Sequence, residues 1–173
     1  MKIEKSIQTL FVLTIALIFA SCGGNAQNIN ENDPAPDFTL SDAFGESYTL
    51  SGLSGNPVII YFYPKANTSG CTKQACGIRD NWSKFREHNI TVLGISVDSK
   101  ESIAEFIEDH NLNFPLLSDE SKEVSRAYGV LNDFGVASRI TFIIDKNGMV
   151  AKIIRDVNVE DHAEEVFQFA STL

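Results

Sequence analysis

Residues 61–76 of the chain are YFYPKANTSGCTKQAC, in which an apolar strand ends, a loop turns and a helix begins at a cysteine. The run of β-branched and aromatic residues from 58 to 63 predicts a buried strand. Pro64 cannot donate a hydrogen bond to a neighbouring strand, so we expect the strand to end there. Turn-forming residues follow, and the helical spacing of apolar residues after Cys71 predicts a helix over residues 71–88.

Cys71 lies in the first turn of this expected helix. Unpaired backbone N–H groups and the positive end of the helix dipole favour an anion there, so the thiolate is stabilised and can act as a nucleophile at neutral pH. Thr68, three residues earlier, is expected to cap the helix or to hydrogen-bond a ligand held over the sulfur. The stretch therefore predicts a reactive-thiol site.

Cys76 follows Cys71 by five residues. On an intact helix this spacing separates the two Cα atoms by about 8.6 Å, beyond the limit of roughly 7 Å for a disulfide. The two cysteines can bond only if the start of the helix unwinds, which favours a catalytic couple. A structural disulfide in an oxidising compartment is the alternative reading of the same pair.

At these residues the sequence resembles the peroxiredoxins of the AhpC/TSA superfamily, and among them the peroxiredoxin Q or bacterioferritin comigratory protein branch. The family motif P-x-x-x-T-x-x-C is matched by Pro64, Thr68 and Cys71, and the second cysteine of the branch is matched by Cys76. Ser69 departs from the family, which usually has proline there, and this change removes no reacting group.

The resemblance implies a thiol-dependent peroxidase that reduces hydrogen peroxide and organic hydroperoxides. The Cys71 thiolate would attack the peroxide, while Thr68 and Arg139 align it and stabilise the developing charge and Pro64 shields the sulfur. The Cys71 sulfenic acid would then be resolved by Cys76 as an intramolecular disulfide. A thioredoxin-like dithiol protein would recycle that disulfide, without a metal or organic cofactor, and the branch is often monomeric.

The first residues read as a leader. Two lysines precede an apolar run over residues 7–20 that is too short to span a bilayer, and Ala20-Ser21-Cys22-Gly23 follows. We expect a lipoprotein-type signal peptide over residues 1–21, with Cys22 lipidated, and an exported, membrane-anchored protein. An ordinary cleaved signal peptide and an uncleaved anchor are the alternatives. The polar residues 22–33 predict a flexible tether, so the domain is expected over residues 34–173.

A chain of 173 residues with 43% apolar and 21% charged residues suffices for one globular domain. Its formal net charge of −9 argues against nucleic acid and anionic lipid as partners. We therefore expect contact with a membrane only through the N-terminal lipid.

The remaining pattern alternates strands with helices. After a small hairpin that turns at residues 42–46, we expect a strand over 90–97, a helix over 99–110, a short edge segment at 114–117, a helix over 121–128, strands over 139–145 and 149–155, and a final helix over 160–171. This order predicts a three-layer α/β sandwich. The resemblance identifies it as thioredoxin-like, with a central mixed sheet and an N-terminal hairpin.

Other residues with reactive or charged side chains have structural interpretations. Arg79 is expected in an ion pair on the helix surface, with a role at the site as the alternative. The three histidines, His88, His110 and His162, lie near helix ends without metal-ligand spacing, so we expect capping or solvent-exposed side chains. Trp82 and Phe85 share the inward face of their helix and are expected in the core.

Two other functions remain open. A membrane-tethered thiol-disulfide oxidoreductase would share the leader and the fold, but those proteins use Cys-x-x-Cys and a later cis-proline, whereas here four residues separate the cysteines and no proline follows Pro115. A non-enzymatic lipoprotein with a structural disulfide is the other. The chain contains no phosphate-binding glycine loop, dinucleotide fingerprint or nucleophile elbow, which leaves thiol chemistry.

Overall fold

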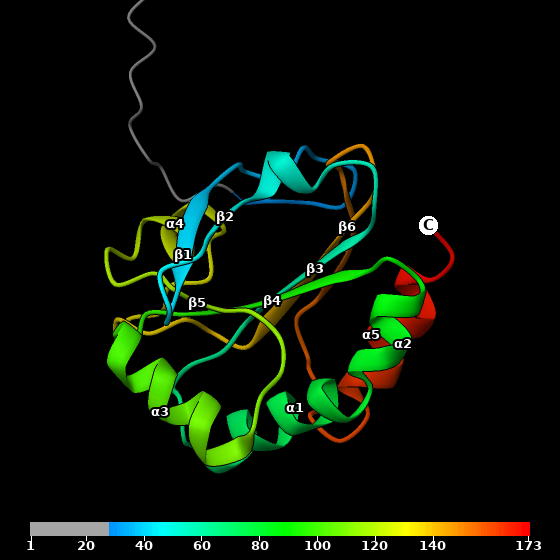
Figure 1. Ribbon diagram of the computed structural model, residues 1–173. Coiled ribbons are helices and arrows are strands. Elements are labelled where there is room, and N and C mark those ends of the chain that lie inside the picture. Colours follow the sequence, from blue (N-terminus) through cyan, green and yellow to red (C-terminus); the bar gives the residue numbers. More distant parts are fainter. Residues whose placement is uncertain (1–27) are drawn as a thin grey trace, which may run out of the picture.

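The computed structural model describes residues 28–173, which build one seven-stranded mixed sheet in the order β2-β1-β5-β4-β3-β6-β7 (Figure 1). The strands are β1 (Thr39–Asp42), β2 (Ser47–Thr49), β3 (Val58–Phe62), β4 (Thr91–Ser96), β5 (Leu116–Ser118), β6 (Ile140–Ile144) and β7 (Val150–Ile154). The helices are η1 (Leu50–Leu53), α1 (Ser69–Asp80), α2 (Trp82–Glu87), α3 (Lys100–His110), α4 (Glu123–Ala127) and α5 (His162–Ala170). The expected signal peptide and Cys22 lie outside the described residues.

The central strand β3 is buried on both faces and separates two hydrophobic cores. Its residues alternate, with Ile59 and Tyr61 in the core beneath α1, α2, α3 and α5, and Ile60 and Phe62 in the core beneath α4 and η1. Figure 1 shows the same division, with α1, α2, α3 and α5 on one side of the sheet and α4 on the other. The three-layer sandwich with a mixed sheet and an N-terminal hairpin is therefore confirmed.

The prediction of a single helix over residues 71–88 is wrong, because the helix is interrupted at Asn81, which separates α1 from α2. The Asn81 side-chain amide donates to Gly77 O at 2.9 Å, and its backbone N–H donates to Ile78 O instead. A side chain that competes for the helical carbonyl interrupts the regular pattern. Phe85 is fully buried and Trp82 is partly buried against the same core, as predicted.

The segment predicted at the edge of the sheet is an interior strand, so that expectation is also wrong. β5 pairs in parallel with β4 and antiparallel with β1, which aligns Ser41 with Ser118. The N-terminal hairpin covers what would otherwise be an open edge of the sheet.

Residues 28–33, expected within the tether, pack against β7. Ile29 is buried in the second core, and the backbone of Asn32 and Asp33 exchanges hydrogen bonds with Val150 at 2.8 and 2.9 Å. Glu31 accepts a further bond from the Ile153 N–H at 3.1 Å. The folded domain therefore begins by residue 28, because one apolar side chain and these bonds fix the segment to the sheet.

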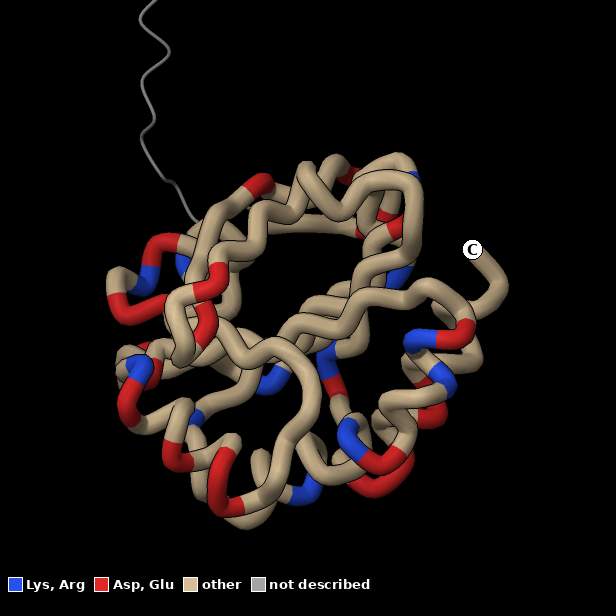
Figure 2. The backbone as a smooth tube through the Cα atoms, in the orientation of Figure 1, with Lys and Arg blue, Asp and Glu red and all other residues tan. Residues whose placement is uncertain are grey.

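Acidic residues lie on several elements of the molecule, and Figure 2 shows them along α3. That helix carries Glu101, Glu105, Glu108 and Asp109. Within residues 28–173, no helix combines the length and apolar character that crossing a bilayer requires.

Gly94 of β4 leaves room for the side chain of Tyr61, its partner on the neighbouring strand β3. A methyl group at this position would come within 2.4 Å of Leu116 Cδ2 and 2.7 Å of the Tyr61 hydroxyl, and both side chains are fully buried. We expect Gly94→Ala to lower the free energy of unfolding by about 1–3 kcal/mol, the usual cost of overpacking a core. Urea denaturation measures this change. Gly52→Ala is the matched control, because the added methyl meets only Thr49 Cβ at 4.0 Å, and equal stability of the two variants would contradict the prediction.

Candidate active site

The loop between β3 and α1 is fixed by bonds to its surroundings and places Cys71 at the start of α1. The Ala66 N–H donates to Asp98 Oδ2 at 2.8 Å, and Asn67 bonds both Asp109 and the His110 ring near the end of α3. Cys71 is the third residue of α1 and only 1% exposed. The predicted position of the thiol in the first helical turn is confirmed.

Thr68 occupies the N-cap position of α1, but its side chain does not cap the helix, so that alternative is wrong. The hydroxyl instead donates to Lys65 O at 2.9 Å and closes the preceding turn. The Thr68 side chain therefore accepts no hydrogen bond from the N–H groups of the first turn. These groups remain oriented toward the start of the helix, where an anion is favoured.

Arg139 reaches Cys71 from the other side of the site. It directly precedes β6, which pairs with β3, and its Nη2 lies 3.3 Å from Cys71 Sγ. Its Nη1 donates to Gln74 Oε1. A methyl group on Gly70 would lie 3.2 Å from Nη2, so the glycine leaves room for the guanidinium. The site thus places the fixed positive charge of Arg139 directly beside the sulfur of Cys71.

Cys71 and Cys76 are both free thiols on the uninterrupted helix α1. Cys76 is half-buried, five residues beyond Cys71. Pro64 lies half-buried two residues after the end of β3, in the loop that leads to α1. The structure thus brings Cys71 and Arg139 into contact, and it places Pro64, Thr68 and Cys76 on the loop and helix around them.

Two buried residues behind the arginine were missed by the sequence reasoning. Gln74 lies one helical turn after Cys71 and is 1% exposed, and the His162 ring lies against it. The expectation of a capping or exposed His162 is wrong, since this side chain is fully buried. Its spacing to Val166 and Ala170, four and eight residues on, was a signal that it shares their inward face.

The other two histidines lie at helix ends as predicted. His88 bonds Lys84 O at the end of α2, and His110 occupies the last turn of α3. Among residues 28–173, no group of three or more His, Cys, Asp or Glu side chains is arranged to hold a metal ion.

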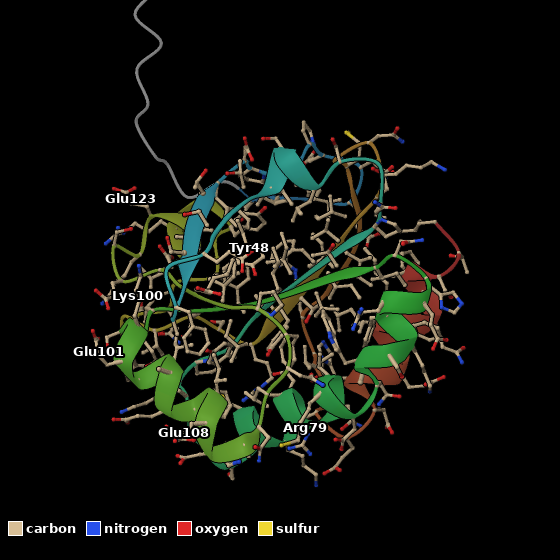
Figure 3. The ribbon with its side chains drawn as sticks, in the orientation of Figure 1. Tyr48, Arg79, Lys100, Glu101, Glu108 and Glu123 are labelled. Atoms are coloured by element: carbon tan, nitrogen blue, oxygen red, sulfur yellow. The ribbon has the colours of Figure 1, made fainter. Side chains whose placement is uncertain are left out.

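Arg79 forms the predicted ion pair on the helix surface, with Nε 2.8 Å from Asp80 Oδ1. Its Nη1 also donates to His110 O at 2.6 Å, which ties the end of α1 to the end of α3. Figure 3 labels Arg79 beside this junction. His110 also holds Asn67, so α3 is attached to the chain on both sides of the Cys71 to Cys76 segment.

The buried imidazole should make stability depend on pH. Burial, and then the positive charge of Arg139, lower the pKa of His162 from its ordinary value of 6.5 to about 4. In the unfolded chain His162 therefore binds a proton near pH 6.5, whereas in the folded protein it binds one only near pH 4. Stability falls as the pH decreases through this window, by up to about 3 kcal/mol from this group.

Urea denaturation across the same window, compared between the wild type and His162→Asn, isolates this contribution. The variant should lose stability less steeply than the wild type as the pH falls, because asparagine does not titrate. Identical pH dependence in the two proteins would show that His162 is not held neutral.

The chain matches a family model and several named proteins. The AhpC/TSA family model matches residues 32–153. Peroxiredoxin Bcp of Escherichia coli K12 is 38% identical over 148 residues, which cover 82% of this chain and 95% of that protein. The chloroplastic peroxiredoxin Q of Sedum lineare is 40% identical over 148 residues, which cover 84% of this chain and 80% of that protein.

Solved structures share this fold. The peroxidoxin BcpB of Mycobacterium tuberculosis matches with a TM-score of 0.78 and 34% identity, over 84% of this chain and 98% of that chain. A bacterioferritin comigratory protein of Xanthomonas campestris, described for its alkyl peroxide reduction activity, matches with a TM-score of 0.73 and 30% identity, over 78% of this chain and 90% of that chain. These likenesses confirm the thioredoxin-like fold.

Proposed function

Since the chain belongs to the AhpC/TSA family, in its Bcp and peroxiredoxin Q branch, we propose that it reduces hydroperoxides with the thiolate of Cys71. It is a thiol-dependent peroxidase, an oxidoreductase whose substrates are hydrogen peroxide and organic hydroperoxides. The observation that carries the assignment to Cys71 is its place in the first turn of α1 with the Arg139 guanidinium 3.3 Å from the sulfur.

The first step is a displacement at oxygen. The Cys71 thiolate attacks the terminal oxygen of the peroxide, the O–O bond breaks, and the leaving oxygen takes a proton to become water or an alcohol. The sulfur is oxidised to a sulfenic acid and the peroxide is reduced. Arg139 donates toward the sulfur and the developing negative charge, and the Thr68 hydroxyl aligns the peroxide. Pro64 limits access of water to the sulfur.

The second step uses Cys76. Its thiolate attacks the sulfenic sulfur, the S–O bond breaks, and the leaving hydroxide takes a proton to become water, so an intramolecular disulfide forms. The five-residue spacing on α1 requires the first turns of the helix to unwind before the sulfurs can meet. A thioredoxin-type dithiol protein then reduces the disulfide and becomes oxidised itself. Both cysteines belong to one helix, so one chain suffices, and we propose that the protein acts as a monomer.

Peroxide consumption by the reduced protein tests this function, with thioredoxin as the electron source and hydrogen peroxide, cumene hydroperoxide or a fatty-acid hydroperoxide as the substrate. We expect turnover that depends on both the dithiol and the peroxide. A protein that ignores all three peroxides but catalyses insulin disulfide reduction would instead be a thiol-disulfide oxidoreductase.

We also propose that Cys22 is lipidated and that the protein is exported and anchored to a membrane by this lipid. The support is the sequence itself, with two lysines, a short apolar run and a cysteine after Ala20-Ser21. Labelling of cells with a radioactive or clickable palmitate should mark the wild type and not Cys22→Ala. Absence of label on the wild type would leave an ordinary signal peptide or an uncleaved anchor.

A further inference from the structure

A buried network of hydrogen bonds leads away from the reactive sulfur, and it includes an imidazole that the reaction above does not use. Arg139 donates through Nη2 to Cys71 Sγ and through Nη1 to Gln74 Oε1. The Gln74 Nε2 atom lies 3.2 Å from His162 Nδ1, and His162 Nε2 lies 2.9 Å from Thr141 Oγ1. Gln74, His162 and Thr141 are each no more than 1% exposed, so these contacts are shielded from water.

In this network, each donor determines which atom of the next side chain must act as the acceptor. A guanidinium only donates, so Gln74 must turn its oxygen toward Arg139. The Gln74 amide nitrogen then points at His162 and needs an acceptor, because a buried donor without a partner is costly. Nδ1 is the nearer ring nitrogen, at 3.2 Å against 3.5 Å for Nε2, and Nε2 already has Thr141 Oγ1 at 2.9 Å. We therefore assign the acceptor to an unprotonated Nδ1 and the ring proton to Nε2, from which it donates to Thr141 Oγ1.

We infer that His162 is a positioning residue for the peroxidase reaction, whose neutral Nδ1 holds the Gln74 amide in the orientation that keeps the Arg139 guanidinium on Cys71. The inference rests on the proposed function of Cys71. His162 itself contacts neither the sulfur nor the substrate in this inference. The side chain influences the reaction only through Gln74 and Arg139.

The surroundings of His162 keep the ring neutral. The charged group that faces it is Arg139, and the Tyr61 ring packs against it from β3 with centroids 5.9 Å apart. Burial raises the pKa of Tyr61 well above its ordinary value, so the phenol carries no negative charge that would favour an imidazolium. A protonated ring would place an N–H against the Gln74 amide nitrogen and reverse the amide, which would turn N–H groups toward Arg139.

The first test compares the wild type, His162→Phe and the double variant Gln74→Glu/His162→Phe by the rate constant for Cys71 oxidation under excess hydrogen peroxide and by the thiolate absorbance at pH 7. His162→Phe keeps an aromatic ring at this position and removes the acceptor. We expect the rate constant to fall about 10-fold to 100-fold, the usual loss when a residue that orients a metal ligand through a hydrogen bond is replaced. The thiolate fraction should fall with it. Gln74→Glu combined with His162→Phe should restore most of both, because a carboxylate accepts from Arg139 through either oxygen and has no amide to orient.

The second comparison covers the case in which His162→Phe does not fold, as judged by circular dichroism. Asparagine places its oxygen near the position of Nδ1, whereas glutamine reaches the position of Nε2. His162→Asn should therefore keep the rate constant within about threefold of the wild-type value. His162→Gln should lower it about 10-fold to 100-fold, as expected for His162→Phe.

Two results would overturn the inference. One is a folded His162→Phe protein that reacts as fast as the wild type, and the other is a His162→Phe defect that Gln74→Glu does not relieve. Equal rates for the asparagine and glutamine variants would also contradict it. A wild-type protein whose Cys71 does not react with peroxide would refute the proposed function instead, and the thiolate absorbance would still test the positioning role.

Discussion

The Cys71→Ser variant is expected to lose peroxidase activity by at least about 10⁴-fold, as enzymes do when their nucleophile is removed. A serine hydroxyl does not ionise near neutral pH, so the charge of Arg139 and the start of α1 have no anion to stabilise. The peroxide would meet no nucleophile. Peroxide consumption coupled to thioredoxin oxidation measures the loss directly.

The loss should be chemical and not structural. Serine is close in size to cysteine, so circular dichroism and the urea midpoint should remain near the wild-type values. The contrasting variant is Cys76→Ser, which should still react once with peroxide but fail to turn over with a dithiol reductant. If Cys71→Ser kept its first reaction with peroxide and Cys76→Ser lost it, the roles of the two cysteines would have to be exchanged.

Replacement of Arg139 should have the second largest effect. Arg139→Ala removes the donor 3.3 Å from Cys71 Sγ, and we expect kcat/KM for hydrogen peroxide to fall about 10²-fold to 10³-fold, as for other donors that stabilise developing charge. The thiolate absorbance at pH 7 should fall too, because the positive charge beside the sulfur is gone. Steady-state kinetics and ultraviolet titration measure the two effects separately.

Arg139→Lys distinguishes charge from geometry. Lysine keeps the charge but cannot reproduce the fork that contacts Cys71 and Gln74 together, so its activity should lie between those of the wild type and Arg139→Ala. Arg126→Ala is the control for loss of an arginine, because Arg126 lies on α4 and its side chain donates to Ser121 O, away from the site. An Arg139→Ala protein as active as this control would remove Arg139 from the mechanism.

The positions of the strands and of Cys71 could be predicted because local residues determine them. Pro64 ends β3, and the turn of residues 145–148 joins β6 to β7. The α3 helix begins as predicted, with the Ser99 side chain accepting from the Ser102 N–H. In each case, residues within a few positions of one another contain the information.

The features that the sequence did not reveal depend on contacts between distant segments. β5 becomes an interior strand only because the hairpin from residues 39–49 pairs with it, and Ile29 is buried only because its segment docks on β7. Gln74 and His162 are 88 positions apart, so their contact requires α5 to pack on α1. The break at Asn81 is the exception, because its cause is a local side-chain bond that helical spacing alone does not expose.

Intact-mass analysis of the reduced protein after one equivalent of hydrogen peroxide is the most direct test of the assigned thiol chemistry. A Cys22→Ser background leaves Cys71 and Cys76 as the only thiols of the chain. We predict that this protein loses two hydrogens within seconds, that further replacement of Cys76 with serine gives a gain of one oxygen, and that further replacement of Cys71 gives no rapid change. A parent protein whose mass stays unchanged, or a Cys71→Ser variant that is oxidised equally fast, would contradict the assignment of Cys71 as the attacking thiol.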